Sequence, residues 1–515
     1  MNFVEVCAEI VGEENIDVDV TLQAVSGEQK VVPAIVRPAS TNEVQRIVRM
    51  AELARVPIYP VSTGRSWGMG STLPPHDDCV VVSLERMNNV RKIGDGYAVI
   101  EAGVTQGALA DQLSGKGFFL DATGSGRHTS VLGCALDRGV AYNSHRSDTI
   151  SGLEVVLGNG RIINTGFGHY DNAIASPFYS DGIGPSLDGL FMQSNFGVVT
   201  AATVRLQPVA DHHCCFIGRI ADDQLTQTIE RLDTLKRKGI ISCVPHIANR
   251  ARTMISLAPA VYEFYRARDK TLSRKQAEAI VAKRLPSAWS MIGSLSGTLG
   301  QVLEGTKAIW SAMRGIGSVV FVNETILTLA GRALNFASFV PSAKSLLAFV
   351  ESSQEVFGMT KGLPSNSALR SVYWPVAAET GDYLNPDSGE AGLLYCLPII
   401  PTNPTTVQSA LTVIKNAAEK YGFEPYITLN LLEGALEGVV NIAFDRRQDS
   451  ETNRAHCCIN EMLGGLAAYG IYPYRVGISQ MSHVVHHDSF WETVLGIKHA
   501  LDPKGIIAPR RYSLE

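Results

Sequence analysis

Two loops rich in small residues are the first segments of this chain that could do chemistry. One spans residues 62–70 and contains three glycines, and the other spans residues 123–126. Backbone N–H groups in such loops can bind a diphosphate, because small side chains let the ligand approach closely. Glycine-rich loops are also common as plain turns, and neither loop matches Gly-x-Gly-x-x-Gly or Gly-Lys-Ser/Thr. The loops alone therefore suggest a nucleotide cofactor weakly, and they disfavour an NAD-type Rossmann domain.

Three histidines near the C-terminus raise the question of a metal site. His483 and His487 are four residues apart and could share one helix face with His486 between them. No His-Glu-x-x-His arrangement accompanies them, and the chain has no Cys-x-x-Cys. We therefore expect no metal, and either an exposed polar face or a substrate-pocket role for these histidines.

Alternating strands and helices should position the first loop. Ser40 and Glu43 have capping-box spacing, and the apolar residues that follow repeat with the 3.6-residue period of a helix. We expect this helix to end before Pro57. The β-rich run at 56–61 should then be a strand that leads directly into the loop.

Later segments predict a hairpin and then a different kind of layer. Residues 154–157 and 161–164 flank an Asn-Gly turn, which favours an antiparallel hairpin. From about residue 212 the pattern changes to a split antiparallel sheet covered by helices. The expected elements near its end are strands at 393–398, 426–431 and 439–444 and helices at 405–421 and 452–469.

Composition bounds the class of protein. With 515 residues the chain is long enough for two domains, and its net charge of −5 is the wrong sign for binding nucleic acid. The first nine residues carry two glutamates and no basic region, so we expect no secretory signal. We expect no membrane span, because the apolar stretches are too short, including the one near Val319 that meets Glu324 and Arg332. Nine cysteines, two pairs of them adjacent, indicate free thiols in a reducing compartment. We expect a cytoplasmic protein.

Several segments together resemble the vanillyl-alcohol oxidase and p-cresol methylhydroxylase family of flavoproteins. The first-loop segment 56–66 looks like the family's first FAD diphosphate loop. The other matching segments follow in the family's order: 101–105, 130–133, 138–140, 152–160, 188–191, 193–200 and 501–509. The resemblance covers most of 30–208 and 390–513.

The resemblance implies an α+β, two-domain fold and an FAD-dependent enzyme. An FAD-binding domain would comprise residues 1–211, completed by 471–515, and an antiparallel cap, or substrate, domain would comprise 212–470. The enzyme would transfer hydride from a 4-alkylphenol or aryl alcohol to flavin N5. Dioxygen or a cytochrome would reoxidise the flavin, and the chain would form a homodimer. Two alternatives are tailoring of a secondary metabolite and a flavin-binding subunit with little catalysis of its own.

By the same resemblance, FAD would lie along both loops and beside the strand expected near 198–206. Arg511 would lie near the pyrimidine edge of the flavin. A cation there would favour the anionic reduced flavin. Without the resemblance, Arg511 would be a solvated tail residue. The implied FAD-binding residues are Pro60, Ser62, Thr63, Gly64, Arg65, Ser66, Trp67, Ser125, Gly126, Ser130, Gly133, Cys134, Arg138, Gly139, Gly197, Val199 and Arg511.

The resemblance also implies catalytic residues. Tyr474 and Arg475 match a pair that binds and deprotonates a phenol, whereas by themselves they would be a strand-end pair with a surface charge. An acidic residue is expected before Gly152, where Asp148 is the first candidate and His145 the second. The alternative for Asp148 is a helix-capping role.

The chain departs from the family pattern at several positions. Met69 stands where the family's third phenol-binding residue, a tyrosine, is expected, which weakens the inference of phenolate binding. Arg65 stands where related oxidases have a flavin-linking histidine, and the cap segment 436–439 contains no histidine. We expect noncovalent FAD, with Tyr426 as the alternative covalent attachment site.

Overall fold

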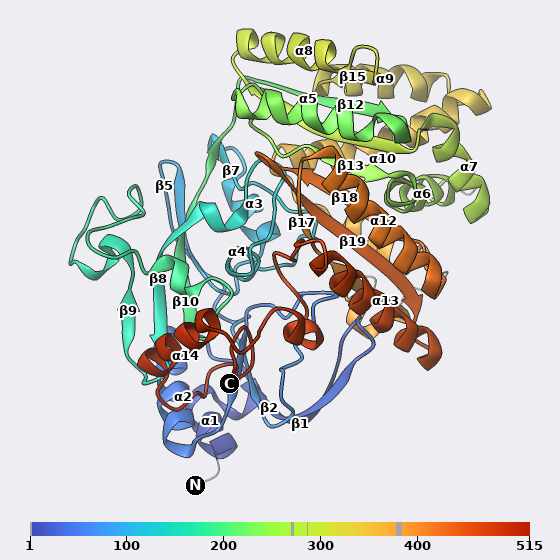
Figure 1. Ribbon diagram of the computed structural model, residues 1–515. Coiled ribbons are helices and arrows are strands. Elements are labelled where there is room, and N and C mark those ends of the chain that lie inside the picture. Colours follow the sequence, from blue (N-terminus) through green and yellow to red (C-terminus); the bar gives the residue numbers. More distant parts are fainter. Residues whose placement is uncertain (1–2, 269–271, 286, 377–383) are drawn as a thin grey trace.

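The computed structural model describes residues 3–268, 272–285, 287–376 and 384–515, and Figure 1 shows sheets and helices in two groups. The first group contains a four-stranded sheet in the order β1-β2-β4-β3. Its strands are β1 (Ile16–Gln23), β2 (Gln29–Val36), β3 (Ile58–Val61) and β4 (Val80–Ser83), and α1 (Phe3–Val11) and α2 (Thr41–Ala54) share its core. Strand β3 pairs with β4 in parallel and runs directly into the first Gly/Ser loop.

The predicted helix after Ser40 is confirmed as α2, and it ends before Pro57 as expected. The Ser40 side chain accepts a hydrogen bond from the Glu43 backbone N–H at 3.2 Å. The Glu43 carboxylate accepts from the backbone N–H of Ala39, one residue earlier than a capping box would use. The sequence spacing thus identified the helix start, although the return bond shifts by one residue.

A five-stranded antiparallel sheet forms the second layer of this group, in the order β5-β6-β10-β8-β9. Its strands are β5 (Val90–Gly94), β6 (Tyr97–Glu101), β8 (Ile150–Leu157), β9 (Ile162–Asn164) and β10 (Gly197–Arg205). The predicted hairpin is confirmed, since Val155 pairs with Ile163 across β8 and β9. Between β6 and β8 lie α3 (Gln106–Leu113) and α4 (Val131–Leu136), and the second Gly/Ser loop lies between these helices.

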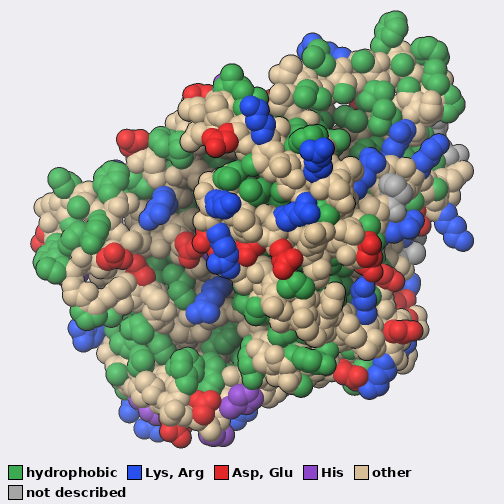
Figure 2. Space-filling model, turned by 45° about the horizontal axis from the view of Figure 1, so that its top comes forward, with side chains coloured by type: hydrophobic (Ala, Val, Ile, Leu, Met, Phe, Trp, Pro, Cys, Tyr) green, Lys and Arg blue, Asp and Glu red, His purple; other side chains and the backbone are tan. Residues whose placement is uncertain are grey.

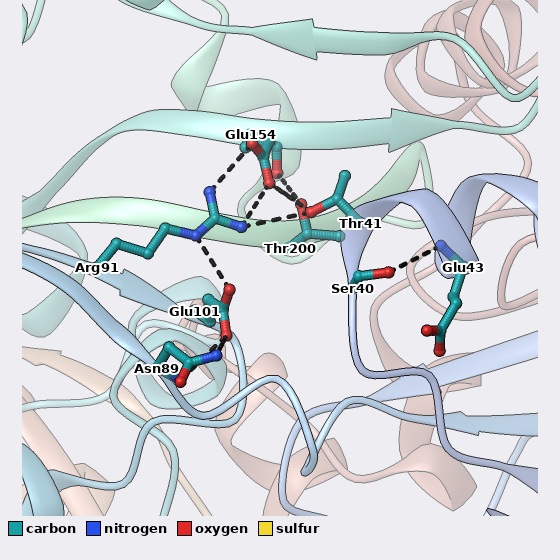
Figure 3. A network of polar contacts seen from close by, with 8 residues as sticks. All are labelled: Ser40, Thr41, Glu43, Asn89, Arg91, Glu101, Glu154 and Thr200. Carbon is teal, nitrogen blue, oxygen red and sulfur yellow. Dashed lines mark hydrogen bonds and ion pairs between the residues drawn. The ribbon is translucent and has the colours of Figure 1, made fainter. Parts of the chain in front are cut away.

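A polar network ties this sheet to the start of α2 (Figure 3). The Arg91 guanidinium donates to Glu101 at 3.1 Å and to Glu154 at 3.0 Å. The same Glu154 carboxylate accepts from Thr41 at 2.6 Å and from Thr200 at 2.8 Å. Burial by itself would raise the pKa of Glu154, but these bonds lower it overall, so the carboxylate stays ionised. The network therefore holds β5, β6, β8, β10 and α2 in one arrangement.

The second group is built on an antiparallel sheet in the order β15-β12-β14-β13-β18-β19-β16, with β17 also paired to β19. The strands are β12 (His212–Ile220), β13 (His246–Asn249), β14 (Trp289–Gly297), β15 (Gly317–Val322), β16 (Ala391–Cys396), β17 (Ile399–Pro401), β18 (Tyr426–Leu431) and β19 (Ala435–Asp445). Two short strands, β7 (Phe118–Phe119) and β11 (Gln207–Pro208), pair with each other as a separate antiparallel sheet. The predicted order of strands and helices near its end is confirmed, with β19 starting four residues earlier than expected.

Helices pack on both faces of this sheet. On one face are α5 (Leu225–Arg237), α8 (Leu299–Met313), α12 (Pro404–Tyr421) and α13 (Asp449–Ala467). The other helices are α6 (Arg250–Arg266), α7 (Arg274–Arg284), α9 (Glu324–Phe336), α10 (Pro341–Thr360) and α11 (Ser367–Tyr373). Ile427 packs in the first of these cores and Tyr426 against α6 and α7, because neighbouring strand residues face opposite sides. Figure 2 shows hydrophobic side chains gathered at the upper right of the molecule. Leu329 and Phe336 of α9 are among the exposed hydrophobic residues of the chain.

The C-terminal segment returns to the first group, where the red ribbon of α14 (Ser489–Leu501) lies beside the blue N-terminal part in Figure 1. Ile507 forms a parallel bridge with Ile58 of β3, and the Ala508 N–H donates to the Ile58 carbonyl at 2.8 Å. The buried Lys498 ammonium fixes this return, since it donates to Asp502 at 2.5 Å and to the Ile507 carbonyl at 2.8 Å. Within the described residues, no helix is both long and apolar enough to cross a membrane.

Candidate active site

A cavity of about 450 Å³ lies where the two Gly/Ser loops, the C-terminal return and the antiparallel sheet of the second group meet. This sheet is called the cap sheet below. One side is lined by backbone-rich segments that include 60–67, 123–125 and 193–199. The other side is lined by side chains of β13, β16, β18, β19, α6 and α11. A volume of this size suits an organic ligand, and the two kinds of wall suggest a cofactor side and a substrate side.

Most of the expected FAD-binding residues line this cavity. Those that line it are Pro60, Ser62, Thr63, Gly64, Arg65, Ser66, Trp67, Ser125, Ser130, Gly133, Cys134, Gly139, Gly197, Val199 and Arg511. Gly126 and Arg138 are not among the lining residues, and Arg138 lies at a second hollow. The structure thus brings together two loops that lie about sixty residues apart in the sequence.

The cofactor side fits a diphosphate and an extended cofactor. Gly133 of α4 packs closely on the first loop, since a Cβ at this position would lie only 2.3 Å from the Ser62 hydroxyl oxygen. Gly64 lines the cavity with a φ of +66°, a left-handed conformation that favours glycine. The Asn195 carboxamide oxygen is buried and has no hydrogen-bond partner among the described residues, while its nitrogen donates to the Ala508 carbonyl at 3.1 Å. These features leave polar backbone and one amide oxygen ready for a ligand.

Tyr474 and Arg475 lie on the cavity wall, as their expected role requires. The Tyr474 backbone is held on both sides, because its N–H donates to the Leu397 carbonyl at 3.0 Å and its carbonyl accepts from Gln193 at 2.8 Å. Burial raises the pKa of Tyr474 above its usual range, so its hydroxyl is a donor at neutral pH. The pair is therefore rigid and part of the cavity rather than an exposed strand end.

Asp137 is a cavity residue that the sequence did not single out. Its carboxylate lies 3.4 Å from Nη1 of Arg475 and 3.6 Å from Nη2 of Arg511. Burial alone would lower the pKa of Arg475, but its interactions with Tyr474 and Asp137 raise it overall. The only sequence signal was the position of Asp137 beside the expected Arg138-Gly139 segment.

The substrate side contains a cluster of polar side chains from elements far apart in the sequence: Tyr142, His246, Arg252, Tyr395, Thr428, Asn430 and Asn441. His246 Nδ1 lies 2.8 Å from the Val244 carbonyl and its ring stacks on Tyr142 at 4.5 Å. Burial lowers the pKa of His246 to about 4, so the imidazole is neutral, with Nδ1 carrying the proton. Apart from Tyr142, which lies in the segment before Gly152, no pattern in the sequence marked these residues.

Tyr395 approaches the position left open by Met69. Met69 is buried in the first loop but does not line the cavity, whereas Tyr395 of β16 does. The Tyr395 ring packs on the same loop, because a Cβ on Gly68 would lie 2.6 Å from it. In the family pattern the third phenol-binding tyrosine belongs to the first loop itself. In this chain a tyrosine from β16, Tyr395, packs against that loop instead.

The two acid–base candidates before Gly152 lie outside the cavity wall. Asp148 is exposed and lines the second hollow, near Arg138 and Arg205. His145 Nδ1 lies 3.8 Å from the carboxylate of Glu437 on β19, and burial lowers the pKa of this histidine. Glu437 itself is fully buried, and burial raises its pKa to about 7.

The alternative covalent attachment site also lies away from the cavity. Tyr426 is on the same sheet face as Thr428 and Asn430, yet it packs in a hydrophobic cluster with α6 residues and does not line the cavity. Arg65, at the place of a flavin-linking histidine in related oxidases, donates to the His128 carbonyl at 3.0 Å and so joins the two loops.

Comparisons with known proteins agree with this geometry. Residues 32–166 match an FAD binding domain. The chain is 34% identical over 496 residues to 1'-carboxy-chondrochloren decarboxylase of Chondromyces crocatus, covering 93% of this chain and 90% of that protein. It is 25% identical to the 4-cresol dehydrogenase [hydroxylating] flavoprotein subunit of Pseudomonas putida, over 94% of this chain and 88% of that subunit.

Solved structures match over the full chain. Substrate-bound p-cresol methylhydroxylase superposes with a TM-score of 0.82 at 23% identity, covering 100% of this chain and 96% of the other. The 4-ethylphenol oxidase of Gulosibacter chungangensis, in complex with isoeugenol, gives 0.83 at 22% identity, covering 100% and 97%. The predicted α+β fold, an FAD-binding region with an antiparallel-sheet cap, is confirmed.

Proposed function

This chain belongs to the vanillyl-alcohol oxidase and p-cresol methylhydroxylase family of FAD-dependent oxidoreductases, and from that premise we propose that it oxidises the benzylic carbon of a 4-alkylphenol or aryl alcohol. Its cofactor is FAD. The observation that carries the proposal is that Tyr474 and Arg475 line the same cavity as the expected FAD-binding loops. We also propose that residues 1–211 with 471–515, and 212–470, are its two domains.

The residues of the chain would act on the phenol rather than on the leaving hydrogen. Arg475 keeps a permanent positive charge, and the Tyr474 hydroxyl donates a hydrogen bond, so together they stabilise a phenolate oxygen. A phenolate pushes electron density toward its para substituent, which makes loss of hydride from the benzylic carbon easier. FAD, when bound, supplies the hydride acceptor at N5.

A second candidate is an oxidative decarboxylation, favoured by the relative named as a decarboxylase and by an arginine on the substrate side of the cavity, Arg252. If the carbon adjacent to the benzylic carbon carried a carboxylate, loss of hydride from the benzylic carbon, with FAD as the acceptor, would let that carboxylate leave as CO2. The electrons of the broken C–C bond form the new C=C bond. An alkenyl phenol results, and no further oxidant is required.

The electron acceptor is part of the proposal. The 4-cresol dehydrogenase relative is named as a flavoprotein subunit, which supports a partner protein such as a cytochrome. Dioxygen is the other acceptor that we propose, and a homodimer is the expected assembly. Oxygen consumption compared with cytochrome reduction during turnover distinguishes the two acceptors.

Flavin bleaching in the absence of oxygen tests the proposal. 4-Ethylphenol or vanillyl alcohol should bleach the flavin of the purified holoprotein. The methyl ether of 4-ethylphenol should not, because it cannot form a phenolate. Arg475→Met should slow the bleaching about 100- to 1000-fold. If no phenol or aryl alcohol bleaches the flavin while dithionite does, the proposal is wrong and a flavin-binding role with little catalysis gains support.

A further inference from the structure

Arg252 is held firmly at the start of α6, on the substrate side of the cavity. Its backbone N–H donates to the Asn249 side chain at 2.8 Å, which caps the helix. The same Asn249 bonds to Pro425 and Ile427 at the start of β18, at 2.9 and 3.2 Å, so the cap is anchored to the sheet. The Arg252 side chain then reaches the cavity wall, where Nη1 donates to the Ser371 hydroxyl at 3.2 Å.

This guanidinium has no carboxylate partner in the described part of the chain, unlike two other arginines of the cavity. Arg475 and Arg511 share Asp137, and Arg65 on the cofactor side bonds to a backbone carbonyl. Arg252 has a single side-chain hydrogen bond among the described residues, from one of its five N–H donors. A half-buried cation with unused donors that line a cavity is well suited to an anionic ligand.

The neighbours of Arg252 are neutral and can assist an anion. Burial raises the pKa of Tyr142 and Tyr395 and lowers that of His246, and the positive charge of Arg252 acts on all three. All three groups are therefore uncharged at neutral pH, and none competes with a ligand as a counter-ion. The Tyr142 side chain also lines the cavity, so its hydroxyl can donate to the same ligand.

We propose that Arg252 binds a carboxylate on the para side chain of the substrate, so that the substrate class is a 4-hydroxyphenyl carboxylic acid. This proposal rests on the proposed function for its phenol end. The planar guanidinium fork matches the two oxygens of a carboxylate. With Tyr474 and Arg475 at the phenol and Arg252 at the acid, the cavity would hold the substrate by both ends.

Binding of compounds that cannot be oxidised tests the carboxylate subsite independently of turnover. Calorimetric titration of the holoprotein with 3-phenylpropanoate and with its neutral amide, 3-phenylpropanamide, should show the acid binding about 10- to 100-fold more tightly. Arg252→Met should abolish this preference, and Arg252→Lys should retain part of it. Arg250→Met is the matched control, because Arg250 is an exposed arginine of the same helix and does not line the cavity.

The phenolic acid and its amide, which can be oxidised, then separate the proposed function from the proposed carboxylate subsite. 3-(4-Hydroxyphenyl)propanoate should bleach the flavin at lower concentration than its amide, and Arg252→Met should remove that difference. Carboxylate preference without any bleaching would refute the proposed function and leave the subsite standing. Bleaching without a carboxylate preference, or a preference that survives in Arg252→Met, would overturn the subsite. Ser371→Ala removes the hydroxyl that accepts from Arg252 and that also donates to the Ala368 carbonyl at 2.6 Å. It should weaken the preference, and it covers the case in which Arg252→Met does not fold.

Discussion

Arg475 forms an ion pair with Asp137 inside the cavity, with Nη1 and Oδ2 3.4 Å apart, and Arg511 approaches the other oxygen of the same carboxylate at 3.6 Å. One acid thus balances the cation proposed to bind the phenolate and the cation expected beside the flavin. The net charge felt by the flavin and by the phenolate therefore depends on Asp137.

Asp137→Asn should raise the two-electron reduction potential of the bound flavin. The change leaves two guanidinium charges without their acid, and positive charge favours the anionic reduced flavin. We expect a rise of about 30 mV, which corresponds to ~1.4 kcal/mol for a two-electron couple. Dye-coupled reductive titration measures it, and Asp148→Asn, at an exposed residue outside the cavity, is the control. An unchanged or lower potential in Asp137→Asn would contradict the role of this carboxylate.

Tyr395→Phe should slow flavin reduction by 4-alkylphenols. Tyr395 lines the cavity, and its ring packs on the first loop, where Met69 stands at the position of the tyrosine expected from the family. Loss of one hydrogen bond to a developing oxyanion should lower the rate about 10- to 100-fold. Rapid-mixing absorbance measures this rate, with Tyr469→Phe, an exposed tyrosine beyond α13, as the control. Equal rates in Tyr395→Phe and wild type would show that Tyr395 does not replace the missing tyrosine.

Glu437→Gln should make the protein more stable at pH 8 than wild type. Burial raises the pKa of the folded-state carboxyl from 4.5 to about 7, so folding favours its protonated form. The stability contributed by that proton is present below pH 4.5 and is lost as the pH rises to about 7. An uncharged glutamine removes this loss, which is at most about 3 kcal/mol.

Urea denaturation at pH 5 and pH 8 measures the effect. The free energy of unfolding of wild type should fall more steeply with pH than that of Glu437→Gln. Glu433→Gln, at an exposed glutamate of the same region, should behave as wild type. Parallel pH profiles for wild type and Glu437→Gln would mean that the carboxyl titrates normally in the folded state.

Acid precipitation of the purified protein should release FAD into the supernatant. Tyr426 packs against helical residues outside the cavity wall, so no bond from it to the flavin is expected. Tyr426→Phe should therefore retain as much FAD as wild type before precipitation. Flavin absorbance that stays with the wild-type pellet and moves to the supernatant in Tyr426→Phe would instead identify Tyr426 as the attachment site.

The sequence determined the features that depend on neighbouring residues. The helix that begins after Ser40, the hairpin around Asn159-Gly160 and the order of elements from 391 to 467 follow from capping, turn chemistry and hydrophobic period, which act over a few residues. Segments that resemble the family's motifs and follow in the same order identified most of the loop residues that line the cavity. They also identified Tyr474 and Arg475 on its wall.

Only the tertiary structure decided which side chains complete the cavity. These side chains come from three distant elements: Asp137 from the end of α4, Arg252 from α6 and Tyr395 from β16. No local pattern links residues so far apart. They meet because the cap sheet packs over the two loops and because Lys498 holds the C-terminal return against β3. Burial then sets their chemistry, since the charge balance of Asp137 and the unused donors of Arg252 arise only from what the fold places beside each of them.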